Sequence, residues 1–240
     1  MAQWGRIAGF RVVVSWPETG YAPPPVARPA ADPRLARRSR LAGLVGAVLV
    51  LGGLAAIIFA VAAQQHAPQP AASAAGRIGP VHGPTLKRSA PVSVQIPAIG
   101  VNSRLLHLGL NGNGTMAVPS LTSSAGLAAW YKYSATPGQA GASVIEGHVD
   151  SLKGPAVFYR LGALRPGNTI NVKLADGVTA IFRVTGVREY AKTSFPSHAI
   201  YGASNYAALR LITCGGAFDY RTGHYLSSTV VYASLVSSRR

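Results

Sequence analysis

The sequence is 240 residues long, 48% hydrophobic and 12% charged, with a formal net charge of +16. Its 27 glycines and 17 prolines favour a loop-rich β domain over a helical bundle, and they exclude a coiled coil. We expect no nucleic-acid partner, because the positive charge reflects a shortage of carboxylates, seven in all, and the cations of the later sequence are scattered rather than clustered.

Residues 1–40 form the first segment. They combine clustered prolines at positions 23–25 with a group of arginines that includes Arg34, Arg37 and Arg40. Apolar residues do not recur there with the period of a helix or a strand. We therefore predict a disordered basic tail on the cytoplasmic side of a membrane.

A single transmembrane helix is predicted for residues 41–63, where every residue is apolar or glycine. At about 1.5 Å per residue this helix is roughly 34 Å long, enough to cross a hydrocarbon core of about 30 Å. The alternative is a cleavable signal peptide with its site at residues 60–62, but the apolar stretch is longer than such peptides use. The arginines before the helix hold that end in the cytoplasm, so the rest of the chain is expected outside the cell membrane.

Beyond the helix, residues 64–90 are rich in Ala, Pro, Gly and Gln, which predicts a flexible linker. Residues 91–240 form the predicted catalytic domain, in which short β-like runs alternate with turn residues. The predicted strands cover residues 92–96, 143–145, 169–174, 178–190, 209–213 and 229–233. Asp176 and Gly177 predict a tight hairpin, and short helices are expected at residues 122–130, 158–161 and 205–208. Many short strands without alternating long helices indicate a closed or nearly closed β-barrel.

Cys214 is the single cysteine, so the chain has no intramolecular disulfide. A free cysteine often only fills a core. Here it follows the apolar run 209–213 and precedes Gly215 and Gly216, a position that both fixes the thiol and opens it to solvent. His148 follows a second apolar run in the same manner. A thiol paired with an imidazole is the arrangement that makes cysteine a nucleophile near neutral pH.

Four motifs in order resemble the sortase family. Residues 211–214 read Leu-Ile-Thr-Cys, similar to the cysteine strand of that family, and Gly147-His148 is similar to its histidine loop. Residues 92–101 resemble its opening strand, and the surroundings of His148 and Cys214 resemble the actinobacterial class F branch. The resemblance spans about residues 91–236, essentially the whole exported domain.

The resemblance implies an all-β domain built as an eight-stranded sortase-type barrel with short helices. It also implies a cysteine transpeptidase that cleaves an LPxTG-like sorting signal of secreted proteins through a thioester on Cys214. His148 is the implied acid and base, and an amine of a peptidoglycan precursor is the implied acceptor. Neither a metal nor another cofactor is expected.

The third site residue departs from the pattern. In familiar sortases an arginine lies on the strand after the cysteine strand, at a position that aligns near Ser228 in this sequence. The nearby replacements are Arg221, which we favour, and Arg210, four residues before the cysteine on the same strand face. Asp150 is either a residue that orients His148 or a turn residue. Because the usual arginine is missing, a catalytically silent, membrane-tethered peptide-binding module is the alternative function.

Overall fold

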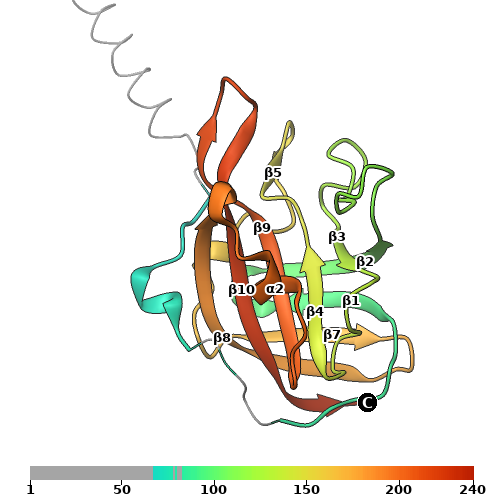
Figure 1. Ribbon diagram of the computed structural model, residues 1–240. Helices are drawn as coiled ribbons and strands as arrows, with labels where there is room; N and C mark the ends of the chain where they lie inside the picture. Colours follow the sequence, from blue (N-terminus) through green and yellow to red (C-terminus); the bar gives the residue numbers. More distant parts are fainter. Residues whose placement is uncertain (1–66, 78, 80–82) are drawn as a thin grey trace, which may run out of the picture. The chain divides into compact units, whose positions relative to one another are not determined.

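The computed structural model describes residues 67–77, 79 and 83–240. Eight strands close a barrel in the order β1-β2-β3-β4-β9-β10-β8-β7 (Figure 1). The bounds of these strands are Pro91–Ile96 (β1), Val101–Leu108 (β2), Ala128–Tyr131 (β3), Gly141–Glu146 (β4), Thr169–Leu174 (β7), Thr179–Ala191 (β8), Ala207–Asp219 (β9) and His224–Arg239 (β10). The closed eight-stranded barrel confirms the fold class predicted from the sequence.

Neighbouring strands of the barrel run antiparallel except at two places, where β3 pairs in parallel with β2 and β9 pairs in parallel with β4. Strands β5 (Asp150–Ser151) and β6 (Gly154–Pro155) form a small separate sheet. The described helices are all short. They are α2 (Ser197–Tyr201) and the 3-10 turns Ala72–Ala75, Pro97–Ile99, Leu161–Ala163 and Lys192–Ser194.

The local predictions were correct where turn chemistry and β-branched residues were strong. The strand at Thr169–Leu174 has its predicted bounds, and Lys173 pairs with Thr179 across the predicted hairpin. The predicted helix at 122–130 is wrong, because residues 128–131 pair with β2 and β4 as β3. The predicted helix at 205–208 is also wrong, since residues 207–208 pair with β4 as the start of β9. In both places sheet pairing outweighs the helix preference of alanine.

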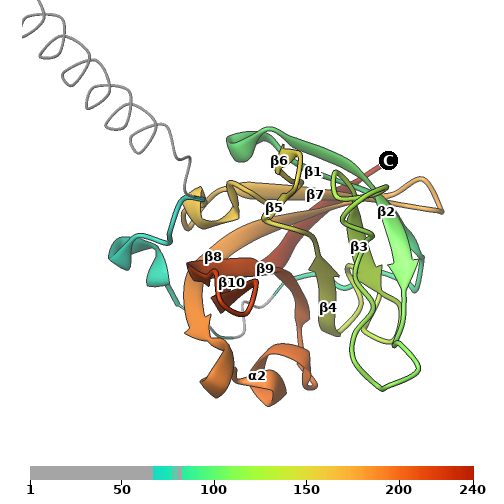
Figure 2. The ribbon, with the colours of Figure 1, turned by 90° about the horizontal axis from the view of Figure 1, so that it is seen from above.

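The two faces of strands β4 and β9 pack against different surroundings, because successive side chains in a strand point to opposite faces. Ile145, Leu209 and Leu211 belong to the main core inside the barrel. Val144 and Ile212 belong to a second apolar cluster that includes Ile200 of α2. Figure 2 shows α2 outside the barrel wall, so the segment between β8 and β9 covers part of the outer face.

Part of the predicted linker packs on the barrel. Ala74 is fully buried in the main core, and Arg188 of β8 donates a hydrogen bond to the Ala75 carbonyl at 3.4 Å. The Leu86 backbone N–H donates to the Gly138 carbonyl at 2.8 Å. These contacts attach residues 72–75 and Leu86 to the barrel, although their composition resembles that of a free spacer.

The predicted tail at 1–40 and the predicted transmembrane helix at 41–63 lie outside the described residues. Within the described part of the chain, every helix is too short or too polar to cross a bilayer.

Candidate active site

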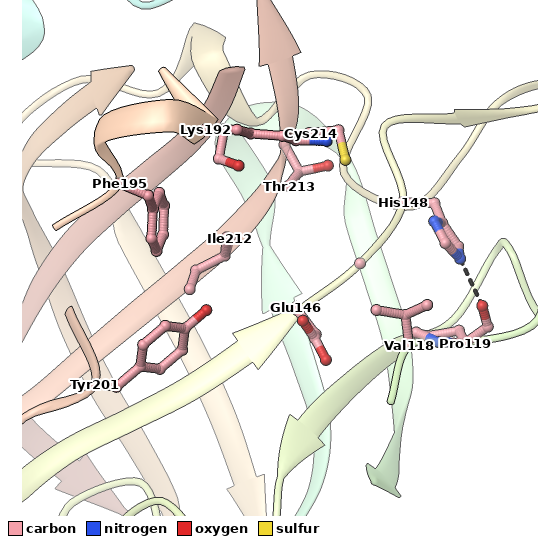
Figure 3. A pocket seen from close by; sticks show the side chains of 12 residues that line it. Val118, Pro119, Glu146, His148, Lys192, Phe195, Tyr201, Ile212, Thr213 and Cys214 are labelled. Atoms are coloured by element: carbon pink, nitrogen blue, oxygen red, sulfur yellow. Dashed lines mark hydrogen bonds between the residues drawn. The ribbon is translucent and has the colours of Figure 1, made fainter. Parts of the chain in front are cut away.

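A pocket of about 430 Å³ opens on the outer face of β4 and β9 (Figure 3). Its walls come from the loop between β2 and β3, the end of β4 with the residues after it, the β8–β9 connection, and facing residues of β9 and β10. The lining residues are Val118, Pro119, Glu146, Gly147, His148, Lys192, Phe195, Tyr201, Ile212, Thr213, Cys214 and Ser228. Cys214 and His148, predicted from separate motifs, therefore line one pocket.

Cys214 lies within β9, directly opposite Ser228 of β10. Its side chain points to the outer face because Ile212, two residues earlier, lies in the outer apolar cluster. The thiol is free and partly exposed. Gly216 follows with φ +73°, and a Cβ there would lie 2.7 Å from the Ser227 Oγ. The glycines after Cys214 thus permit a turn of backbone that a side chain would obstruct.

His148 follows β4 and lies across the pocket from Cys214 (Figure 3). Its Nε2 lies 2.5 Å from the Pro119 carbonyl oxygen. A carbonyl can only accept, so Nε2 carries the proton and donates. The remaining ring nitrogen, Nδ1, is on the side of the ring toward Cys214 (Figure 3). The β2–β3 loop thus fixes the imidazole so that its second nitrogen is free to exchange a proton.

Neither predicted arginine lines this pocket. The Arg221 side chain is 86% exposed and pairs with Asp219 at 3.8 Å, in the turn between β9 and β10. Arg210 is buried in β9, where its guanidinium lies 4.7 Å from the centre of the Tyr232 ring. It donates to the Tyr206 hydroxyl at 3.3 Å and to the Leu209 carbonyl at 3.2 Å. Both side chains are engaged elsewhere, Arg221 at the surface and Arg210 in packing.

Lys192 is the one lysine or arginine among the described residues that line the pocket. It begins the 3-10 turn after β8, and its side chain extends toward Cys214 in Figure 3. Ser228 lines the same pocket and pairs with Cys214 across the strands. Ser228, near which the sequence comparison expected an arginine, therefore lies next to the thiol.

Glu146, the last residue of β4, also lines the pocket. Burial raises the pKa of its carboxyl from 4.5 to about 7. Its Oε1 is buried and has no hydrogen-bond partner within the described structure. A carboxylate removed from water without a partner is costly, so its presence in a pocket with a thiol and an imidazole makes Glu146 a candidate functional residue.

Asp150 accepts a hydrogen bond from the Tyr225 hydroxyl and lies in β5. Burial, followed by this hydrogen bond, raises the pKa of Tyr225 well above its ordinary value. The ring of His148 is held by Pro119 instead. Of the two roles left open for Asp150, the contact with Tyr225 favours a structural one, joining the β5 segment to the start of β10.

Sequence reasoning missed Glu146 and Lys192. A signal for Glu146 existed, since strand alternation places residues 144, 146 and 148 on one face, and a carboxylate there follows four buried residues. Lys192 had no comparable signal, because its approach to Cys214 depends on the path of the β8–β9 connection. No group of three His, Cys, Asp or Glu residues in the described ranges is arranged to hold a metal ion.

Comparison with known proteins provides the family context. Residues 94–236 match the family model described as the sortase domain. Among solved structures, the chain is similar to a lid mutant of sortase A from Corynebacterium diphtheriae, at 19% identity over 63% of this chain and 73% of that one, with a TM-score of 0.47.

Two further structures resemble the chain to a similar degree. Sortase C2 of Group B Streptococcus pilus island 1 is 17% identical over 63% of this chain and 76% of that one, with a TM-score of 0.46. Sortase A of Listeria monocytogenes is 16% identical over 64% and 90%, with a TM-score of 0.46. No curated protein sequence matches the chain significantly.

Proposed function

The chain belongs to the sortase family, and we propose that it is a membrane-anchored cysteine transpeptidase that uses Cys214 as nucleophile and His148 as acid and base. The observation that carries this proposal is the shared pocket of Cys214 and His148 on the outer face of the barrel. A peptide can reach this face from solvent, whereas the inside of the barrel is filled by the main core.

The first half-reaction forms a thioester. The thiol proton of Cys214 moves to Nδ1 of His148, while the Nε2–H of the same ring keeps its hydrogen bond to the Pro119 carbonyl. The thiolate then adds to the scissile carbonyl carbon of the substrate. When the tetrahedral intermediate collapses, the carbon–nitrogen bond breaks and the imidazolium returns a proton to the departing amine.

The second half-reaction reverses the roles. An acceptor amine adds to the thioester carbon and loses a proton to the neutral His148. The carbon–sulfur bond then breaks, and the Cys214 thiolate takes back the proton. Water in place of the amine gives hydrolysis, so transfer requires that the amine reach the thioester before water does.

A cation is needed where negative charge develops on the carbonyl oxygen. We propose Lys192 for this role in place of the sequence-based choice, Arg221. Both residues are exposed, but Lys192 lines the pocket, whereas Arg221 lies outside it and pairs with Asp219. Arg210, the other sequence-based candidate, is buried against Tyr232 and does not line the pocket.

The substrate and location follow from the sequence resemblance and the topology argument. We propose that the enzyme resembles class F sortases and cleaves an LPxTG-like signal between Thr and Gly. Secreted proteins bearing this signal at the carboxyl end are the proposed clients, and a peptidoglycan amine is the proposed acceptor. Residues 41–63 would anchor the chain once in the cell membrane, with the tail at 1–40 inside and residues 91–240 outside.

The test is incubation of the full-length chain with a library of LPxTG-like peptides and a primary amine, followed by mass spectrometry. Cleavage between Thr and Gly, and transfer to the amine, are expected for the wild type and absent from a Cys214→Ala variant. A Ser228→Ala variant is a suitable matched control, because it alters the neighbouring residue on β10 without removing the thiol. Equal product from wild type and Cys214→Ala would overturn the proposal.

A silent peptide-binding module is the second candidate, favoured by the observation that neither Arg221 nor Arg210 lines the pocket. The two functions differ in one measurable property. An enzyme accumulates a peptide thioester on Cys214, whereas a silent module binds the same peptide reversibly and leaves the mass of the chain unchanged.

A further inference from the structure

Glu146 occupies the same pocket as Cys214 and His148, but the proposed transpeptidation does not use it. Its side chain projects to the outer face of the barrel wall, because Ile145 before it is buried in the main core. Figure 3 shows the carboxylate between Tyr201 on one side and Val118 with Pro119 on the other.

Among the described residues, the carboxylate has no cationic partner that would balance its charge. Oε1 is buried without a hydrogen bond, and the one ion pair of the described residues joins Arg221 to Asp219. Lys192 lines the same pocket without forming an ion pair with Glu146. Burial raises the pKa of Glu146 to about 7, and no compensating cation lowers it. The part of the pocket next to Glu146 can therefore bind a positively charged group of a ligand.

The walls around Glu146 suit the alkyl part of such a group. Phe195 and Tyr201 form an aromatic wall, with their ring centres 6.2 Å apart, and Ile212 pairs with Glu146 across the strands. The carboxylate charge helps to raise the pKa of Tyr201 to about 12, after burial, which is the larger cause. An aromatic wall beside a carboxylate attracts an ammonium through both its charge and its hydrocarbon stem.

The distance to the thiol places Glu146 within reach of a reacting substrate. Ile212 pairs with Glu146, and Cys214 lies two residues further along β9. With a rise of about 3.3 Å per residue and a strand spacing of about 4.8 Å, the two Cα atoms are roughly 8 Å apart. A group one or two residues from the scissile carbonyl, or the amine that approaches it, can therefore contact the carboxylate.

We infer that Glu146 is the binding site for a primary alkylammonium group of a substrate, an inference that rests on the proposed transpeptidase function. The ammonium donates hydrogen bonds to the carboxylate, and its alkyl stem lies along Phe195 and Tyr201. Two sources supply this chemistry, a lysine side chain next to the cleavage site of the sorting peptide and the acceptor, which binds as an ammonium and loses one proton to solvent before the free amine adds to the thioester.

The first test needs no turnover. Cys214 of the full-length chain is labelled with 2-aminoethyl methanethiosulfonate, which carries an ammonium, and with the neutral n-propyl analogue. The ratio of the two labelling rates is compared among wild type, Glu146→Gln and Glu189→Gln. Glu189 is the matched control, because its carboxylate lies near Gly215 and Gly216 but does not line the pocket.

We expect the preference for the cationic reagent to fall at least fivefold in Glu146→Gln and to stay within twofold of wild type in Glu189→Gln. A smaller fall in Glu146→Gln, or an equal fall in both variants, overturns the inference. Because labelling requires no thioester, this outcome is independent of whether the chain proves to be a transpeptidase.

The second test identifies the source of the ammonium. One arm compares cleavage of LPxTG-like peptides that carry lysine or norleucine before the threonine. The other arm compares transfer to n-butylamine with transfer to hydroxylamine, which is neutral at pH 7. Glu146→Gln should reduce the preference for the cationic substrate over the neutral one at least fivefold in one arm. The arm in which the preference falls identifies the source of the ammonium. If both preferences persist in the variant, Glu146 is not the ammonium site.

Discussion

Two charged side chains on the outer face of the same strand pair have opposite surroundings. Arg210 stacks on Tyr232 and donates to Tyr206 and Leu209 through its two terminal nitrogens, whereas its buried Nε has no hydrogen-bond partner within the described residues. Glu146, on the neighbouring strand toward the thiol end, has an oxygen with no partner. The guanidinium at one end of the face therefore contacts an aromatic ring and two acceptors, whereas the carboxyl beside Cys214 and His148 has no ion-pair partner among the described residues.

The two buried charges have different consequences for the protein. A guanidinium enclosed by aromatic rings and acceptors contributes to packing and specificity of the fold. A carboxylate that is buried without compensation costs folding free energy, and such a cost is typical of positions where a ligand completes the environment. We therefore expect substitutions at the two ends to separate into effects on activity and effects on stability.

The largest expected effect is at the thiol end. His148→Ala should lower kcat/KM for peptide cleavage by roughly 10³-fold, because proton transfer to and from the reacting atoms is lost. Its melting temperature should change little, since the side chain makes one hydrogen bond, to Pro119. Peptide cleavage assays and thermal denaturation measure the two quantities. A variant that retains more than a tenth of the wild-type kcat/KM would remove His148 from the mechanism.

Glu146→Gln should stabilise the protein at alkaline pH. The unfolded carboxyl ionises near 4.5 and the folded one near 7, so wild-type stability falls as the pH rises through this window. The wild type therefore loses up to about 3 kcal/mol by pH 8, and the neutral variant avoids the loss.

Urea denaturation of wild type and Glu146→Gln at pH 4.5 and pH 8 measures whether the difference in their free energies of unfolding has the expected sign. The difference between variant and wild type should be small at pH 4.5 and favour the variant at pH 8. Glu189→Gln serves as the matched substitution. A difference between Glu146→Gln and wild type that does not depend on pH would show that Glu146 is not the group that titrates in this window.

Lys192→Met should lower kcat for thioester formation by roughly 10²-fold, the size expected when a donor to the developing oxyanion is removed. Arg221→Met should stay within about twofold, because its side chain is exposed and pairs with Asp219. Rapid-quench measurement of thioester formation compares them. The opposite order would restore Arg221 as the cation of the site.

A second change sharpens this comparison. Ser228 lies directly across from Cys214 and lines the pocket, so Ser228→Arg brings a guanidinium to the thiol. In the Lys192→Met background, Ser228→Arg should raise the rate of thioester formation at least tenfold. No recovery in a folded double variant would indicate that a cation at this position does not assist the reaction.

The last expected effect is at the Arg210 end of the face, and it concerns stability rather than rate. Arg210→Met should lower the free energy of unfolding by about 2 kcal/mol, because the contact with Tyr232 and two hydrogen bonds are lost. The rate per folded molecule should not change. Denaturant unfolding and active-site titration of Cys214 separate the two. A fall in rate without a loss of stability would assign Arg210 to the site.

The barrel was predictable because its signals are local. The Asp176-Gly177 turn and alternating apolar residues fix β7 and β8, and the resemblance to a known family supplied the number of strands. Strand β3 was not predictable in this way, because its alanines carry a helix preference that only pairing with β2 and β4 overrides.

The residues of the candidate site also differ in whether local sequence signals predict them. Cys214 and His148 were found because each ends an apolar run and belongs to a sortase-like motif. Arg221 was favoured from its short sequence distance to Cys214, yet the turn that contains it directs the side chain to Asp219 and solvent. Lys192 lines the pocket because of the path that the long connection before β9 takes. The residues next to Lys192 in the sequence do not predict that path.

The most direct measurement is the rate at which Cys214 reacts with a peptide-shaped alkylating agent in the native full-length chain, in denatured chain and in native His148→Ala. The account predicts that the native thiol reacts faster than the denatured thiol and that His148→Ala abolishes the advantage. A native thiol that reacts no faster than the denatured one, with no change in His148→Ala, would contradict the claim that the two side chains act together in one pocket.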